Sequence, residues 1–158
     1  MDENVVRESI LQLLKGGQAH MSFEEAVKEF PQEAMNTIFP NGTYSSWNLL
    51  EHIRRTQHDI LDFMLNPNYK ELEWPKDYWP EAKAKATQKE WDKTIEQYLQ
   101  DKKELEKLLM DKKINLSTKV PFGDGQTYIR EFLLVCDHNA YHIGEFAIMR
   151  QTLNTWEK

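Results

Sequence analysis

The sequence predicts an all-α protein, a four-helix bundle with long connections, in a single domain that spans residues 1–158. Most segments repeat apolar residues at helical spacing, and no run alternates apolar and polar residues as a strand would. Four of these helical segments are long, which is the pattern of a helical bundle. A chain of 158 residues favours one domain and can bury a core without disulfides.

The first long helix is expected over residues 2–15. Its apolar face is formed by four residues: Val6, Ile10, Leu13 and Leu14. The Gly16–Gly17 pair that follows is typical of a helix C-terminus. Ser22 and Glu25 then have the spacing of a capping box, which predicts a short helix that ends near Pro31.

The second long helix is expected over residues 45–65, with Ser45 or Ser46 as its N-cap. Its apolar stripe contains Leu50, Ile53, Ile60 or Leu61, and Met64. Asn66 and Pro67 end it. The stretch 66–80 holds three prolines, two tryptophans and two tyrosines, so it cannot form a regular helix.

The third long helix is expected to open at a capping box made by Thr87 and Glu90 and to end near residue 110. Its seam residues are close to heptad spacing: Trp91, Ile95, Tyr98, Leu105 and Leu109, with Lys102 as an exception. This spacing predicts packing against a near-parallel or antiparallel neighbour. Residues 111–127 form a long connection in which a small strand pair is allowed but not required.

The last helix, expected over residues 127–153, contains the stretch DHNAYHIGE. Its buried candidates include Phe132, Val135, Ile143, Phe146 and Leu153. His138 and His142 are four residues apart, so they project about 40° apart and can chelate one metal ion. The alternative is a pair of surface or hydrogen-bonded core histidines. Asn139 stands where a zinc protease carries its glutamate base, which weakens the protease reading.

A metal ion in a helical bundle needs a ligand from a facing helix. His52 is the best candidate, because it lies in the middle of the second helix beside the apolar stripe. His58 projects about 120° away from His52, so one ion cannot easily bind both. We therefore expect His58 at the surface or rim, and we assign no role to His20.

The stretches WNLLEHI, with His52, and DHNAYHIGE together resemble the DinB/YfiT-like family. The resemblance extends over nearly the whole chain, including the Trp-Pro-rich connection. It implies a four-helix bundle with up-down-down-up connectivity, which is often a homodimer. It also implies a metal triad, which maps residue by residue onto His52, His138 and His142.

Three histidines leave a coordination position open for water or substrate, as catalytic zinc sites do. Imidazole suits zinc, nickel, copper and iron alike, so we expect a divalent transition metal, with zinc or nickel preferred. The resemblance implies a thiol S-transferase-like or hydrolase-like enzyme that acts on a small molecule. Such transferases use low-molecular-weight thiols such as bacillithiol or mycothiol. One alternative is a non-catalytic, stress-related metal-binding dimer. Another is a bundle whose histidines meet no metal.

Several further residues are candidates around the histidines. Glu145 lies one turn from His142 and is a candidate hydrogen-bond partner or base. Asp59 lies two turns from His52 and is a candidate for the same cleft, although both carboxylates can also be ordinary solvated groups. Cys136 projects away from His138 and is expected to be a small buried hydrophobe. Segment 66–80 is a candidate roof, with walls from Trp74, Tyr78 and Trp79, or else a cover for one end of the bundle.

Composition narrows the functional classes. The net charge is −6 and the basic residues are dispersed, so no basic face for nucleic acid is expected. No apolar run approaches the roughly 20 residues of a membrane span. The N-terminal stretch MDENVVRES lacks the features of a signal peptide, and a single cysteine excludes an internal disulfide. These features favour a cytoplasmic protein.

Overall fold

The computed structural model describes residues 2–156, and these form an all-helical fold as predicted. The elements are α1 (Glu3–Lys15), α2 (Phe23–Val27), the 3-10 helix η1 (Gln32–Ala34), α3 (Ser46–Leu65), α4 (Gln88–Met110) and α5 (Tyr128–Thr152). The long helices match their predicted bounds closely. Among the described residues, the connection 111–127 makes one isolated bridge, Lys119 with Thr127, in place of a strand pair.

The predicted helix starts are confirmed by their caps. Both capping boxes are formed, because Ser22 and Thr87 each accept a hydrogen bond from the backbone of the glutamate three residues on, and that glutamate bonds back. Ser45 caps α3 in the same way, with Asn48 in the place of the glutamate. These local hydrogen bonds satisfy backbone N–H groups that a helix start leaves unpaired.

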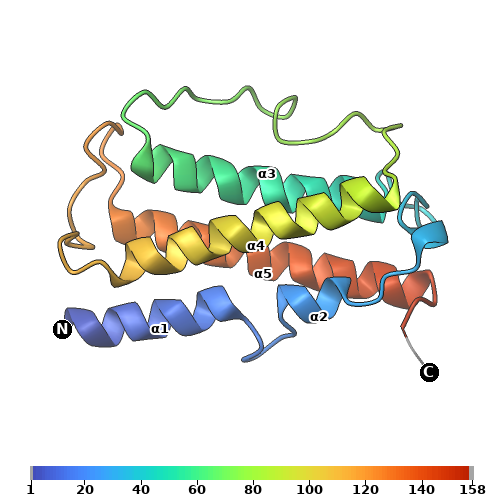
Figure 1. The fold of residues 1–158 in the computed structure, drawn as a ribbon, viewed down its shortest axis with the longest axis horizontal. Coiled ribbons are helices and arrows are strands. Elements are labelled where there is room, and N and C mark those ends of the chain that lie inside the picture. The colour runs from blue at the N-terminus through green and yellow to red at the C-terminus, as the bar shows by residue number, and fades with distance from the viewer. Residues whose placement is uncertain (1, 157–158) are drawn as a thin grey trace.

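The connectivity is up-down-down-up, as Figure 1 shows. α1 and α5 run in one direction, and α3 and α4 run in the other. The long connection 66–87, which we call the strap, runs back along α3, so that α4 can start beside the start of α3 (Figure 1). α3 is therefore antiparallel to α5, and these two helices pack against each other.

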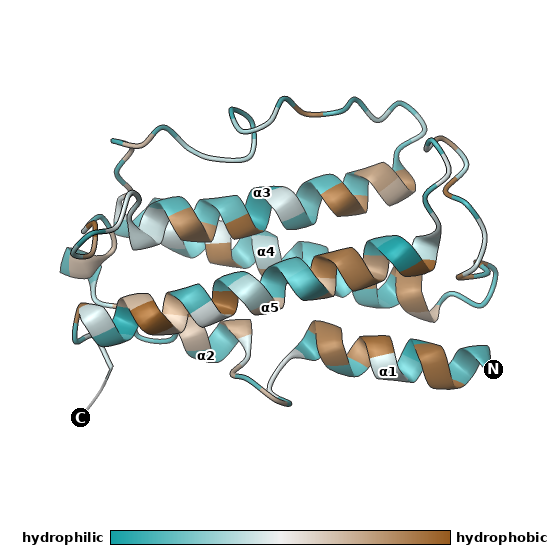
Figure 2. Ribbon diagram, turned by 180° about the vertical axis from the view of Figure 1, so that it is seen from behind, coloured by the Kyte–Doolittle hydropathy of each residue, from teal (hydrophilic) through white to brown (hydrophobic). Residues whose placement is uncertain are grey.

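Two apolar clusters, one toward each end of the bundle, make up the core. One includes Leu49, Leu50 and Ile53 of α3 with Ile143 and Phe146 of α5. The other includes Ile60, Leu61 and Met64 of α3 with Phe132 and Val135 of α5. Between them, α5 has a hydrophilic stretch at mid-length, visible in Figure 2. The bundle therefore has a polar band between two apolar clusters, and the predicted histidines belong to this band.

The apolar face predicted for α1 is wrong at one position. Leu13 is 52% exposed, while Arg7 is buried. The Arg7 guanidinium donates hydrogen bonds to the backbone carbonyls of Leu109 and Ile114 and pairs with Glu3. A long side chain with its charge compensated in this way packs where a hydrophobe was expected.

The seam predicted for α4 is confirmed at most of its positions. Four predicted residues are buried: Trp91, Tyr98, Leu105 and Leu109. Ile95 is only partly buried, and Thr94 takes the inward position, where its hydroxyl donates to Glu51 at 3.1 Å. Lys102 is buried, and its ammonium donates to Glu24 at 2.8 Å and to the carbonyl of Lys15.

No helix of the described chain is long and apolar enough to cross a membrane.

Candidate metal centre

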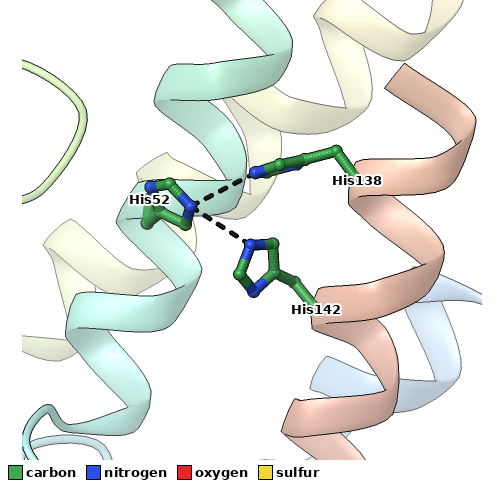
Figure 3. A group of neighbouring side chains, drawn as sticks. All are labelled: His52, His138 and His142. Atoms are coloured by element: carbon green, nitrogen blue, oxygen red, sulfur yellow. Dashed lines mark hydrogen bonds between the residues drawn. The ribbon is translucent and has the colours of Figure 1, made fainter. Parts of the chain in front are cut away.

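The structure brings His52, His138 and His142 together. His52 comes from α3, and the other two come from successive turns of α5, on the side that faces His52 (Figure 3). The Nε2 atom of His52 lies 3.2 Å from Nε2 of His138 and 3.2 Å from Nε2 of His142. One ligand atom from each ring lies within 4.8 Å of the others. The three rings therefore converge through their Nε2 atoms on one point.

This convergence follows from helix geometry. The spacing of four residues puts His138 and His142 on one face of α5. The antiparallel packing of α3 and α5 sets that face opposite His52, in the polar band. His52 is 2% exposed and His142 is 9% exposed, so two of the rings are removed from solvent.

The outer nitrogens of two rings are fixed by acceptors. Nδ1 of His52 lies 3.0 Å from the carbonyl oxygen of Tyr78 in the strap. Nδ1 of His142 lies 2.5 Å from Oε2 of Glu145. A carbonyl or carboxylate oxygen only accepts, so each Nδ1 must carry the proton and each Nε2 of a neutral ring has a free lone pair. Such hydrogen bonds are typical of metal-binding histidines.

Glu145 is held on both sides. Its Oε1 accepts a hydrogen bond of 2.7 Å from the hydroxyl of Tyr44, while Oε2 faces His142. Although burial alone raises the pKa of Glu145, the bonds from His142 and Tyr44 lower it below its usual value. Burial and Glu145 raise the pKa of Tyr44, which keeps this hydroxyl a donor. Glu145 therefore orients His142 as an ionised acceptor, and both of its oxygens are engaged.

His138 is held more loosely. Its Nδ1 makes only a 3.5 Å contact with Oδ1 of Asn139. Asn139 is itself fixed, because its side-chain nitrogen donates to Gln57 at 3.0 Å and to the hydroxyl of Tyr98 at 3.0 Å. The residue that replaces the protease glutamate thus belongs to a buried amide network beside the histidines.

The electrostatic surroundings favour neutral rings. Burial lowers the pKa of His52 to about 4, although the hydrogen bond with the Tyr78 carbonyl acts in the opposite direction. Burial, together with His142 and His52, lowers the pKa of His138 to about 3. Neutral imidazole is the form that binds metal, so these two rings are ready to act as ligands at neutral pH.

The spacing of the rings fits a metal ion. Tetrahedral Zn²⁺ with Zn–N bonds of about 2.0–2.1 Å holds neighbouring nitrogens about 3.3 Å apart. Both separations from the His52 nitrogen are 3.2 Å. Among the residues from 2 to 156, the cluster contains three histidines and no cysteine or carboxylate. A donor set of this kind leaves a coordination position open.

The strap forms a roof over His52. The ring of Trp79 stacks on the His52 ring, with centroids 3.8 Å apart and planes inclined by 7°. Trp74 approaches the edge of the same ring at 6.3 Å and is 67% exposed. Arg55 of α3 holds the strap by donating to the carbonyls of Asp77 and Trp79. Of the two readings of segment 66–80, the structure favours the roof.

The remaining candidate residues lie outside the cluster of three histidines. Asp59 does not bond to a histidine; it accepts hydrogen bonds from the hydroxyls of Tyr69 and Tyr78, at 2.8 Å and 2.7 Å. Cys136 is buried, as expected, and burial raises the pKa of its thiol to about 12. His58 is at the surface and pairs with Asp101 at 2.9 Å, and His20 is exposed.

The sequence did not predict a role for Tyr44, because no local pattern links it to Glu145, which lies 101 positions away.

A family model described as the DinB superfamily matches residues 17–146. The chain belongs to the DinB superfamily. This confirms the resemblance drawn from the sequence and agrees with the all-helical bundle. The matched region contains all three histidines of this DinB-like chain, the whole strap and Glu145. Searches of curated proteins and of solved structures found no match to the chain.

Proposed function

We propose that this protein binds a divalent transition metal ion through His52, His138 and His142 and acts on a small molecule at that site. One observation carries the proposal. The Nε2 atom of His52 has one lone pair, yet it lies 3.2 Å from two other ring nitrogens. A proton on one neighbouring ring can satisfy only one of these contacts. A cation at the point of convergence satisfies all three rings.

The reading without a metal is less consistent with the hydrogen bonds. It requires each ring to be satisfied by protein groups alone. The carbonyl of Tyr78 and the carboxylate of Glu145 do accept hydrogen bonds from two rings, but they accept them from Nδ1. The Nε2 atoms of these two rings point toward the other histidines. If His52 carried its proton on Nε2, its bare Nδ1 would face the carbonyl oxygen, and two acceptors would repel each other.

An enzyme is favoured over a purely structural or storage site. Structural zinc sites usually close with four protein ligands and prefer cysteine. Here three histidines form the cluster within the described chain, and Cys136 points elsewhere as a buried thiol. The non-catalytic metal-binding dimer therefore remains the second reading, and no observation of the site favours it.

Zinc or nickel is the proposed ion, because imidazole ligands suit both metals. A divalent ion at this point supplies Lewis acidity and lowers the pKa of a thiol or water that reaches it. The chain's own residues do the remaining work. Glu145 and Tyr44 fix the direction of the His142 ring, the Tyr78 carbonyl fixes His52, and Trp79 covers the face of His52 and excludes water there.

We propose thiol transfer as the reaction, with a hydrolysis as the alternative. In thiol transfer a low-molecular-weight thiol loses its proton to water, its sulfur forms a bond to an electrophilic carbon, and the leaving group departs from that carbon with the bonding electrons. The thiol is supported by the superfamily resemblance and by the affinity of thiolate for zinc and nickel. The homodimer and the cytoplasmic location stay predictions from the sequence.

Metal content by mass spectrometry tests the proposal. Untagged protein is compared with variants in which His52, His138 or His142 is alanine, and with His58→Ala as a matched histidine outside the cluster. We expect close to one metal ion per chain in the native protein and in His58→Ala, and loss in each of the other three. A native protein that takes up neither zinc nor nickel contradicts the proposal. Turnover of a thiol with a generic electrophile, lost in His142→Ala, then tests the reaction.

A further inference from the structure

A pocket of about 510 Å³ lies where α3, the strap and the start of α5 meet. Its walls come from the second half of α3, from the strap, from the loop 122–126 and from the first turns of α5. Figure 1 shows the strap and this loop meeting at the end of the bundle where α5 begins. None of the three histidines lines this pocket. It is therefore a separate cavity that the proposed metal site does not account for.

The charge in the pocket is strongly unbalanced. Four carboxylates line it, from Asp59, Glu71, Asp124 and Glu131, against one guanidinium from Arg130. Arg130 is already paired with Glu131 at 2.8 Å. The oxygens of Asp59 accept hydrogen bonds from two neutral tyrosine hydroxyls, and in the described chain Asp59 forms no ion pair. The pocket thus lacks a positive charge that would balance Asp59.

The other walls are suited to an organic cation. Four aromatic rings contribute to the lining: Phe63, Tyr69, Tyr78 and Phe122. Aromatic faces attract an ammonium group through their negative π-face, most strongly where water is excluded. Gln126 adds a polar side chain to this lining.

The pocket and the histidines lie on the same face of α3 and on the same face of α5. On α3, Asp59 is seven residues from His52, and on α5, Glu131 is seven residues from His138. Seven residues are nearly two full turns, so each pair lies on one side of its helix, about 10 Å apart along the axis. Tyr78 joins the two places, because its carbonyl contacts His52 and its hydroxyl contacts Asp59.

We propose that this pocket binds the protonated amino group of a small organic molecule whose other end reaches the three histidines; the second half of this proposal rests on the proposed function. The ammonium group lies between the Asp59 carboxylate and the aromatic rings. The molecule extends from the pocket under the strap toward the histidines. The substrate or co-substrate is thus an amine with its reactive atom about 10 Å from the nitrogen.

The ammonium site is tested first in protein freed of metal by a chelator. ¹⁵N-labelled protein is titrated with hexylammonium chloride and, separately, with 1-hexanol, and amide shifts are followed by NMR. We expect hexylammonium to bind at least ten times more tightly and to shift the amides of Asp59 and Gln126. Equal affinity for the two probes, or shifts that leave these amides unchanged, overturns the proposal.

Two variants sharpen this result. Asp59→Asn should weaken hexylammonium binding at least tenfold, whereas Asp62→Asn, one turn further along α3 and outside the pocket lining, should leave it within twofold. If Asp59→Asn does not fold, the double variant Glu71→Gln with Asp124→Asn, at exposed positions, replaces it and should weaken binding about threefold or more. Unchanged binding in the folded variant contradicts the proposal.

A bifunctional probe tests the reach to the histidines. With zinc-loaded protein, 6-amino-1-hexanethiol should bind at least ten times more tightly than hexylammonium, because its two ends engage two sites of one molecule. The gain should vanish in metal-free protein and in His142→Ala. Absence of any gain overturns the link between the pocket and the histidines. If the protein takes up no zinc, the proposed function fails, while the hexylammonium titration still decides the ammonium site.

Discussion

The polar band between the two apolar clusters holds two groups of side chains, which differ in how their hydrogen bonds are completed. In the first group, Gln57 donates to the carbonyl of Tyr98, and Asn139 donates to Gln57 and to the Tyr98 hydroxyl. Each of these donors meets an acceptor. In the second group, the three histidines turn their Nε2 atoms toward one another, and Nδ1 of two rings already faces an acceptor.

This difference separates a structural role from a binding role. A buried network with all its partners present stabilises one arrangement of the helices and needs no ligand. A group of acceptors that face one another is costly until a cation reaches it. Both groups include largely buried side chains from the middle of α3 and α5, so burial alone does not distinguish them. The arrangement of donors and acceptors does.

The largest expected effect is the stabilisation of the folded protein by metal. Zinc at a thousandfold excess over its Kd should raise the free energy of unfolding by about 4 kcal/mol. In His142→Ala this gain should disappear, because the cluster loses one of its three ligands. Denaturant unfolding with zinc and with a chelator measures the difference. A variant that zinc stabilises as much as the native protein would show that the ion binds elsewhere.

The amide network should behave in the opposite way. Asn139→Ala leaves the side-chain oxygen of Gln57 and the hydroxyl of Tyr98 without their donor. Unpaired buried groups cost about 1–3 kcal/mol each, so we expect a loss of about 3 kcal/mol in the free energy of unfolding. The same loss should appear in chelator and in excess zinc. A loss confined to the zinc-loaded protein would place Asn139 with the metal site instead.

Local features of this fold could be predicted from the sequence, and contacts between distant segments mostly could not, with the approach of His52 to His138 and His142 as the exception. The capping residues Ser22 and Thr87 act within one turn of chain, so their spacing predicts the helix starts. The turn spacing on α5 likewise predicts that His138 and His142 share a face. Burial of Arg7 was missed, because its partners are carbonyls more than 100 positions away. Every residue has a backbone carbonyl, so the residue types in a sequence do not indicate which carbonyl will accept a hydrogen bond from a given side chain.

The same reasoning applies to the roof and to the partner of Glu145. The aromatic residues of segment 66–80 predict walls, but which ring stacks on His52 depends on how Arg55 ties the strap to α3. Tyr44 precedes α3 in a loop, and its contact with Glu145 arises only when α5 packs beside α3. Sequence spacing within one helix therefore predicts the contact between Glu145 and His142, but not the contacts that Tyr44 and the strap make with these residues from other parts of the chain.

A smaller effect, on zinc affinity, should follow from changing the hydrogen bond between Glu145 and His142. Glu145→Gln keeps an oxygen for Nδ1 of His142 but removes the negative charge. Groups that orient metal-binding histidines typically change metal affinity by 10–100-fold, and we expect about tenfold weaker zinc binding here. Isothermal titration at fixed pH measures it, with Glu104→Gln on the exposed face of α4 as a control. Unchanged affinity would mean that Glu145 does not orient the ring.

The smallest effect concerns the histidine outside both groups. The hydrogen bond and charge of Asp101 raise the pKa of His58, opposite to the lowered pKa of His52 and His138. A raised pKa adds stability that is complete below the unfolded value of about 6.5 and is lost as the pH rises through the folded pKa. His58→Gln should therefore cost well under 1 kcal/mol at pH 5.5 and less at pH 9, as exposed ion pairs do. Chemical unfolding at both pH values measures this, and a greater loss at pH 9 would show that His58 stabilises the fold by packing and not by its charge.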